Sequence, residues 1–265
     1  MANGEYIALL DSDDLLLPCG LATYDRIIRA LDSPALIIGS VTYFQNGHTV
    51  QPERGGDLDI EVLNYRDYLS KDVAVGLYGS NVVIKKSVLQ QAGGMRVSTP
   101  RTFHMDILDL MLRLGVYGPC VVVRCPTVMA YRSHTTNSIH NTVAMVKGVY
   151  PLLEAERKGQ YPGGRGRRFD RYACIGGMAW CWFKRALKAR RFVLALKLLI
   201  DTSPMIAAGM LKKIRIRIRG ASRPVRLTLD DETDPVRIST SHDGRSALSG
   251  SDSTAVTTNN QSFGV

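Results

Sequence analysis

Three aspartates, Asp11, Asp13 and Asp14, lie within four residues, directly after the short apolar segment 6–10. The length of this segment and its abrupt polar end predict a buried strand, and ligands of open α/β sheets bind at the carboxyl ends of strands. Clustered carboxylate oxygens suit Mg²⁺ or Mn²⁺, which in turn hold diphosphates. Asp11 and Asp13 can share a face only where the chain is still extended. The alternative is structural: Asp13 or Asp14 caps a turn or helix before Leu15.

The residue pattern around this cluster predicts strands and helices in alternation. Gly93-Gly94 ends a short helix for which Ser87 is the candidate N-cap. Strands are expected at 6–10, 35–44, 79–85 and 121–123, with 128–132 extending the sheet, helices at 21–31, 87–92 and 107–114, a hairpin turn at Asn46-Gly47 and a loop at 51–60. The order of these elements predicts an α/β fold.

Composition excludes several classes of protein. The chain has 265 residues, of which 45% are hydrophobic and 22% charged, as in ordinary globular proteins. Its 5 cysteines form no CxxC pair, which favours a reducing compartment over a disulfide framework or a zinc ribbon. The first residues show no basic region followed by an apolar run, so no signal peptide is expected.

Positive charge is concentrated near the C-terminus. Residues 147–226 contain 20 of the 34 Lys and Arg but only 4 of the 24 Asp and Glu. Their apolar window, 192–211, contains Lys197, Asp201 and Pro204, which argues for helices that pack on the core or lie on an anionic membrane face rather than crossing it. A solvated basic face is the alternative, and no motif supports specific nucleic-acid binding. Pro151 and the Gly/Arg loop 162–168 should separate helices, and 214–219 alternates with period two, which is not the pattern of an amphipathic helix.

Several segments resemble family-2 glycosyltransferases, which have a GT-A fold, and they follow the family's order over about residues 2–140. Residues 4–14, GEYIALLDSDD, are similar to the strand that ends in the family's DxD motif. Residues 79–89 (GSNVVIKKSVL), 109–114 (DLMLRL) and 130–138, which begin AYRSH and end in Asn137-Ser138, are similar to three later segments of the same family.

The resemblance implies roles for five residues. Asp11 and Asp13 would bind the sugar nucleotide, with Asp13 holding Mg²⁺ or Mn²⁺ on the diphosphate. His134 would complete the metal shell, and its spacing from Arg132 in an extended segment would turn both side chains toward the diphosphate; a surface histidine is the alternative. Asp106 would be the base that deprotonates the acceptor hydroxyl.

The chain departs from the family pattern in two places. The family has a nucleotide-binding part before the DxD motif, and this chain begins almost at that motif, so low activity of these residues alone is expected. The base motif reads HMDILDL at 104–110; strict alignment from Arg113 places Ile107 on the base, and one inserted residue places Asp106 there. Asp109 is the second candidate, a helix cap is the structural alternative for Asp106, and Asp109 with Arg113 fits an i,i+4 ion pair.

The sequence therefore predicts a partial GT-A, Rossmann-like mixed sheet with flanking helices. The expected divisions are 1–145, the C-terminal part of a catalytic domain; 146–220, a basic helical membrane-proximal region; and 221–265, a disordered tail. The implied function is metal-assisted, inverting sugar transfer from a nucleotide-sugar donor to a glycan or lipid-linked acceptor, in envelope or exopolysaccharide synthesis. The implied location is cytoplasmic, peripheral on the inner face of the plasma membrane. The alternative is an inactive fragment or an accessory membrane-associated protein.

Overall fold

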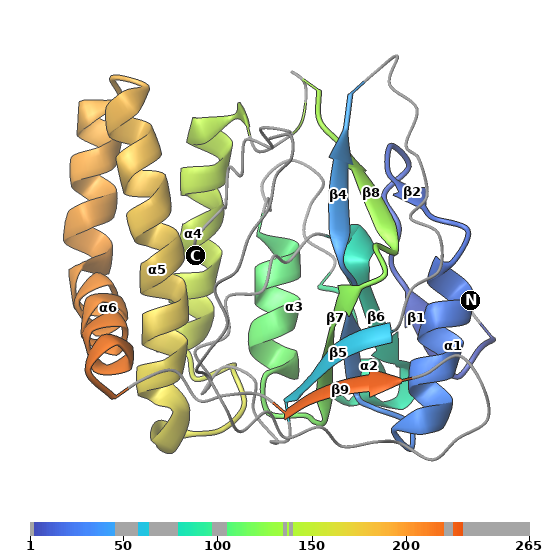
Figure 1. Cartoon of the computed structure of the whole chain (residues 1–265). Helices are drawn as coiled ribbons and strands as arrows, with labels where there is room; N and C mark the ends of the chain where they lie inside the picture. The colour runs from blue at the N-terminus through green and yellow to red at the C-terminus, as the bar shows by residue number, and fades with distance from the viewer. Residues whose placement is uncertain are drawn as a thin grey trace, which may run out of the picture.

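The computed structural model describes residues 3–45, 58–63, 79–96, 105–134, 137, 140–219 and 225–229, and these form a mixed α/β fold. The expected turn at Asn46-Gly47 lies outside the described residues. A six-stranded mixed sheet has the order β1-β6-β3-β7-β5-β9, and a three-stranded sheet has the order β2-β8-β4 (Figure 1). The strands are β1 (Tyr6–Ala8), β2 (Leu15–Leu16), β3 (Leu36–Ile38), β4 (Val41–Phe44), β5 (Leu58–Leu63), β6 (Val82–Lys85), β7 (Cys120–Cys125), β8 (Met129–Arg132) and β9 (Val225–Leu229); the helices are α1 (Gly20–Ala30), α2 (Lys86–Gln91), α3 (Asp106–Leu114), α4 (Thr142–Arg157), α5 (Arg168–Lys188) and α6 (Phe192–Arg219).

The expected strand 35–44 is divided between the two sheets. β3 pairs with β6 and with β7 in the large sheet, whereas β4 pairs in parallel with β8 in the small one. The chain changes sheet at Gly39, where a Cβ would lie 2.4 Å from the Tyr24 hydroxyl oxygen. The Gly39 N–H donates to the carbonyl of Asn81, and the Asn81 side chain donates to the Gly39 carbonyl. This close approach of backbones brings β6 beside the small sheet.

Both faces of the large sheet are covered by helices. One face packs Ile37, Val83 and Val121 against Tyr24 and Ile27 of α1. The other face packs residues of β3, β6 and β7 against Leu89 of α2 and against Leu110, Met111 and Leu114 of α3. The remaining side of α3, at Leu108 and Leu112, packs on α4, α5 and α6, so α3 is buried between the sheet and a helical layer (Figure 1).

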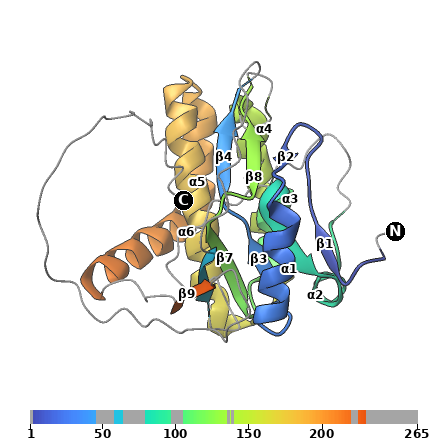
Figure 2. The ribbon, with the colours of Figure 1, turned by 45° about the vertical axis from the view of Figure 1, so that its right-hand side comes forward.

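The helical layer differs from the sequence prediction at Pro151, which lies inside α4 and does not separate two helices. Residues 214–219, within the expected helical region 146–220, belong to α6 although their alternation is not that of an amphipathic helix. Lys212 of α6 is 3.7 Å from Asp170 in the first turn of α5, so the last turns of α6 extend beyond its partner helix (Figure 2). The alternation of residues 214–219 does not end α6, whose earlier turns are already packed against α5.

Three smaller expectations also change. Residues 58–60 were expected in a loop but are the first half of β5. The N-cap of α2 is Lys85, and Ser87 lies within the helix. Residues 225–229, expected in a disordered tail, pair antiparallel with β5 as β9, whereas 230–265 lie outside the described residues. The turn of positive-φ glycines at Gly93 and Gly94 is confirmed, with φ of 80° and 67°.

Helices α5 and α6 approach through glycine. A Cβ on Gly176 would lie 1.9 Å from the backbone oxygen of Met205, so Gly176→Ala should push the two helices apart. We expect it to lower the free energy of unfolding by roughly 1–3 kcal/mol, the usual cost of overpacking. Gly166→Ala is the matched control, since a Cβ there meets no atom of the described structure within 4 Å. Equal thermal unfolding temperatures for the two variants would contradict this packing.

Candidate functional site

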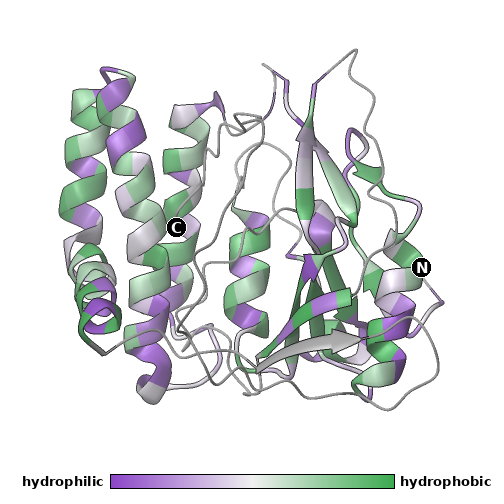
Figure 3. Cartoon of the chain, viewed as in Figure 1, coloured by the Kyte–Doolittle hydropathy of each residue, from purple (hydrophilic) through white to green (hydrophobic). Residues whose placement is uncertain are grey.

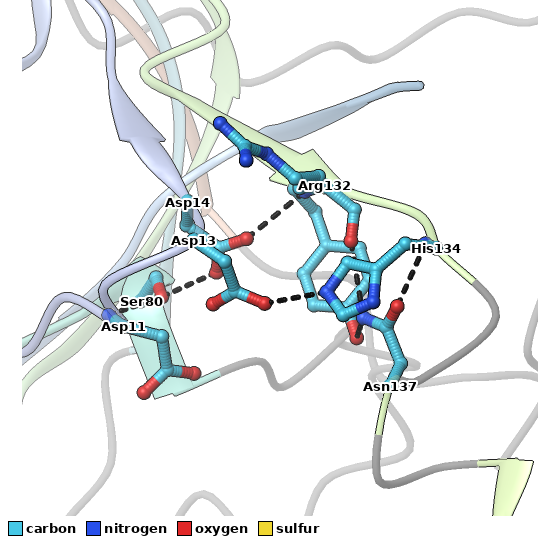
Figure 4. Close-up of polar contacts among 8 residues, drawn as sticks. Asp11, Asp13, Asp14, Ser80, Arg132, His134 and Asn137 are labelled. Carbon is cyan, nitrogen blue, oxygen red and sulfur yellow. Dashed lines mark hydrogen bonds and ion pairs between the residues drawn. The ribbon is translucent and has the colours of Figure 1, made fainter. Parts of the chain in front are cut away.

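The three clustered aspartates form a turn at the end of the first strand. β1 ends at Ala8, the Leu9 N–H still donates to the carbonyl of Val82, and the Asp14 N–H donates to the carbonyl of Asp11 at 3.2 Å. Asp11 and Asp13 therefore do not alternate along an extended chain, and their proximity comes from the turn (Figure 4). The Asp11 carboxylate lies over Gly79, where a Cβ would be 3.0 Å from Asp11 Oδ2.

Asp14 joins three separate segments of the chain. Its side chain is buried; Oδ2 accepts a hydrogen bond from the Ser80 hydroxyl, and Oδ1 accepts from the Arg132 backbone N–H at 2.9 Å. The Ser80 Oγ also accepts from the Asp11 backbone N–H at 2.9 Å. Asp14 is thus the structural member of the cluster, and it aligns the aspartate turn with β6 and β8.

His134 reaches the same turn from the other side. Its Nε2 lies 2.9 Å from Asp13 Oδ2, and because an ionised carboxylate only accepts, Nε2 carries the proton in this contact. Asn137 fixes the turn behind it: its Oδ1 accepts from the His134 backbone N–H at 2.7 Å, and its Nδ2 donates to the Tyr131 hydroxyl and to the Arg132 carbonyl. The structure therefore brings together Asp13 and His134, which are 121 residues apart in sequence.

Arg132 differs from its expected placement. Its guanidinium stacks over the Phe44 ring at 5.3 Å from the ring centroid and points away from the Asp13–His134 pair (Figure 4). The expectation that Arg132 and His134 face the same way is therefore wrong, because Phe44 on the neighbouring strand β4 provides a stacking surface. The positive charge of Arg132 still contributes to lowering the pKa of Asp13.

The carboxyl groups of the cluster have opposite electrostatic environments. The hydrogen bond from His134 is the main cause that holds the pKa of Asp13 below its ordinary value. Partial burial, followed by the negative charges of Asp14, Asp13 and Asp106, raises the pKa of Asp11. Like charges gathered in this way favour a bound cation, which relieves their repulsion.

Asp106 is the first residue of α3. It is exposed, and its Oδ1 accepts a hydrogen bond from the adjacent Ile107 N–H at 2.8 Å. Its charge contributes to raising the pKa of Asp11, which places the two carboxylates within electrostatic range of each other. Asp106 is therefore accessible to solvent at the start of α3.

Asp109, the second candidate base, has a structural role. It is buried, and its two carboxylate oxygens receive hydrogen bonds from Arg113 Nε at 3.0 Å and the Tyr161 hydroxyl at 2.8 Å. Arg96 Nη1 lies 3.1 Å from the same carboxylate. The expected ion pair with Arg113 is confirmed, and because Asp109 is buried and held by Arg113, Arg96 and Tyr161, it is not available to a substrate.

The donor set can be tested against a divalent metal. Among the residues that the structure describes, no three or more His, Cys, Asp or Glu side chains form a metal-binding group. Asp13 and His134 supply one carboxylate and one imidazole, and Asp11 lies on the same turn. Two protein ligands fit an ion that takes its other oxygens from a diphosphate and water, as Mg²⁺ does in phosphate-bearing sites. The residues are compatible with Mg²⁺ or Mn²⁺ that arrives with a diphosphate.

Sequence reasoning left Ser80 and Asn137 without a role. Ser80 is 4% exposed and connects Asp11 to Asp14, and Asn137 holds the turn that presents His134. A small polar residue two positions before the buried strand β6 is the sequence signal for Ser80. Both residues act by positioning the candidate ligands.

Substitution of Asp14 should lower the free energy of unfolding more than substitution of its neighbours in the turn does. Asp14→Ala leaves the buried Ser80 hydroxyl and the Arg132 N–H without their acceptor, and we expect a loss of roughly 1–3 kcal/mol in the free energy of unfolding. This supports the alternative left open by the sequence, in which Asp14 is a structural residue of the turn. Ser12→Ala, in the same turn and exposed, is the control. Denaturant melts of both variants check the difference, which would be absent if Asp14 were only a surface residue.

Neutralising Asp11 should stabilise the folded chain at neutral pH. The folded-state pKa of Asp11 is raised above its ordinary 3.8, so ionised Asp11 lowers the free energy of unfolding at neutral pH. This destabilisation shrinks as the pH falls through the folded-state pKa, and it is gone below 3.8, where Asp11 is protonated in both the folded and the unfolded chain. We expect Asp11→Asn to raise the unfolding temperature by roughly 1–2 °C at pH 7, a small effect because the group is accessible to solvent. Thermal melts between neutral pH and pH 3 should show the gain shrinking. A gain that grows at low pH would contradict the assignment.

The described residues thus define a mixed α/β chain with a carboxylate–imidazole cluster at the end of an edge strand. No known protein family matches the chain, and no curated protein matches it. Among solved structures, it is similar to S. aureus TarS 1–349 in complex with UDP-GlcNAc, with 11% sequence identity and a TM-score of 0.39 over 89% of this chain and 75% of that chain. The TarS 1–349 complex with UDP gives 13% identity and a TM-score of 0.38 over the same shares. This likeness is weak, so the site's own residues must carry any functional conclusion.

Proposed function

We propose that this chain is a glycosyltransferase-type protein that binds the diphosphate of a nucleotide sugar at the aspartate turn. The observation that carries the proposal is the Asp13–His134 contact, with Asp11 and Asp106 within electrostatic range. The turn gathers more negative charge than the side chains around it neutralise. Such a site suits a cation-bridged polyanion better than a neutral ligand.

The residues divide the work between binding and proton transfer. Asp13 and His134 would hold Mg²⁺ or Mn²⁺, and Asp11 would accept hydrogen bonds from the donor nucleotide. Asp106 would take the proton of the acceptor hydroxyl. The acceptor oxygen then bonds to the anomeric carbon as the bond from that carbon to the diphosphate oxygen breaks, with inversion, and the diphosphate leaves with its electron pair.

A bound Mg²⁺ or Mn²⁺ would neutralise negative charge on the departing diphosphate. The protein's contribution is to present Asp13 in its ionised form, which the His134 hydrogen bond favours, and to fix the turn through Asp14 and Ser80. A glycan or lipid-linked acceptor in envelope or exopolysaccharide synthesis belongs to the same proposal.

The proposal is tested by following donor consumption. The full chain would be incubated with Mn²⁺ and a panel of uridine, guanosine and thymidine diphosphate sugars, and release of nucleoside diphosphate would be measured with and without glycan acceptors. Metal-dependent release from one donor, suppressed by chelator, is the expected result. Absence of both release and binding for every donor would reject the proposal.

A further inference from the structure

Helix α6 exposes a continuous apolar face on the side opposite α5. Its inner face packs on the helical layer through buried residues that include Ala195, Leu198 and Met205. Its outer face, defined here as Val193, Leu196, Ile200, Ala207, Leu211, Ile214 and Ile218, is exposed along its whole length. Successive members are 3, 4 or 7 residues apart, which places them on one side of a helix. α6 is the outermost helix of the layer (Figure 1), and apolar residues follow it from end to end (Figure 3).

A face of this kind requires a covering partner. The helix has 28 residues, with Pro204 inside it, and its C-terminal part turns away from α5 (Figure 2). Single exposed apolar side chains are ordinary, but contiguous apolar surface of this extent marks an interaction site. Lys197, which is four residues after Val193, and Ser203 and Pro204, between Ile200 and Ala207, are also exposed on this side of α6; Lys197 pairs with Asp201 at 3.2 Å.

The charge around the face selects among partners. Residues 184–219 contain 11 Lys and Arg and one acidic residue, Asp201, which gives a net charge of 11 − 1 = +10. A second copy docked on this face would bring two such segments together, and their repulsion opposes self-association. A surface with anionic groups outside and an apolar interior would attract the basic residues and cover the apolar outer face of α6.

We propose that the outer face of α6 lies in the interface of an anionic lipid bilayer, with the helix axis parallel to the membrane. By length and composition, Phe192–Ile218 is also long and apolar enough to cross a membrane. Crossing is disfavoured because the inner face is already packed: Gly176 contacts the Met205 backbone and Gly209 lies against the α5 backbone. Exposed basic residues at both ends, Arg190 and Arg191 before the helix and Lys213, Arg215 and Arg217 in its last turns, would contact lipid headgroups. This inference is independent of the proposed sugar transfer.

The test is sedimentation of the full chain with phosphatidylglycerol/phosphatidylcholine vesicles and with pure phosphatidylcholine vesicles. Wild type should bind the anionic vesicles at low salt and be released by high salt. Ile200→Gln removes apolar contact from the outer face without changing charge, and affinity should fall by roughly fivefold to tenfold. Leu21→Gln on α1 is the matched control, since Leu21 and Ile200 are 64% and 63% exposed; its binding should equal that of wild type.

A second pair of variants tests the electrostatic part. Arg215→Gln with Arg217→Gln should weaken binding to anionic vesicles, whereas Lys147→Gln with Arg157→Gln on α4 removes the same charge and should weaken it less. Three results would overturn the proposal. The first is equal vesicle binding by Ile200→Gln and Leu21→Gln, and the second is a bound chain that high salt does not release and only detergent extracts. The third is an oligomer in sedimentation velocity that Ile200→Gln converts to a monomer. The last result would assign the face to a second copy.

Discussion

Asp13→Ala is expected to abolish Mn²⁺-dependent binding of nucleoside diphosphates, with a loss of roughly a hundredfold or more in affinity. Even residues behind a metal ligand change metal affinity by about 10–100-fold, so removal of a ligand itself should cost at least as much. Asp13 is partly exposed, and its side-chain contact is with His134 at the surface of the turn. The fold should therefore survive the substitution, and calorimetric titration of Mn²⁺ with uridine diphosphate measures the loss.

Two controls make this result specific. Asp25→Ala removes a surface carboxylate on α1 that pairs only with Arg29 four residues later, and it should leave binding unchanged. His134→Gln should weaken binding less than Asp13→Ala, because it retains a polar side chain and leaves the carboxylate in place. An Asp13→Ala variant that binds Mn²⁺ and uridine diphosphate as tightly as wild type would show that Asp13 is not a metal ligand.

Asp106→Asn is expected to stop sugar transfer while nucleotide binding persists. A positioned general base contributes about 10²–10⁴-fold, and asparagine fills the same space without accepting a proton. Asp106 is exposed and receives only the local Ile107 N–H, so its neutralisation should not unfold α3. Steady-state rates of nucleoside diphosphate release, with affinity measured in parallel, separate the two functions.

The neighbouring carboxylate provides the contrast for this prediction. Asp109→Asn breaks a buried ion pair with Arg113 and a hydrogen bond from Tyr161, so it should lower the unfolding temperature by several degrees. A rate loss in Asp109→Asn that exceeds the loss in Asp106→Asn, with the fold intact, would move the base to Asp109.

The elements that carry the site were largely predictable from local pattern. Strong apolar runs bounded by turn residues located β1, β6 and β7, and helical spacing located α1 and α3 to within a few residues. Mixed α/β architecture follows from that alternation. The division of 35–44 into two strands was not predictable, because it depends on the approach of Asn81 to Gly39, which are 42 residues apart.

The relations among the site residues were less predictable than their types. The sequence left open whether Asp13 or Asp14 is a structural turn residue; in the structure the chain turns at Asp11, and Asp14 is the buried link to Ser80 and Arg132. Arg132 was expected to face the diphosphate, yet its guanidinium stacks on Phe44. Both outcomes depend on which segment packs beside the turn, and single-sequence patterns do not contain that information.

The most direct measurement of the central claim is the anomalous scattering of Mn²⁺ in crystals of the full chain grown with uridine diphosphate. We expect one manganese peak between the Asp13 carboxylate and the His134 imidazole, with diphosphate density on the side of the metal that the protein leaves open. A peak at another carboxylate cluster, or bound nucleotide with the Asp13–His134 hydrogen bond intact and no manganese beside it, would contradict the account.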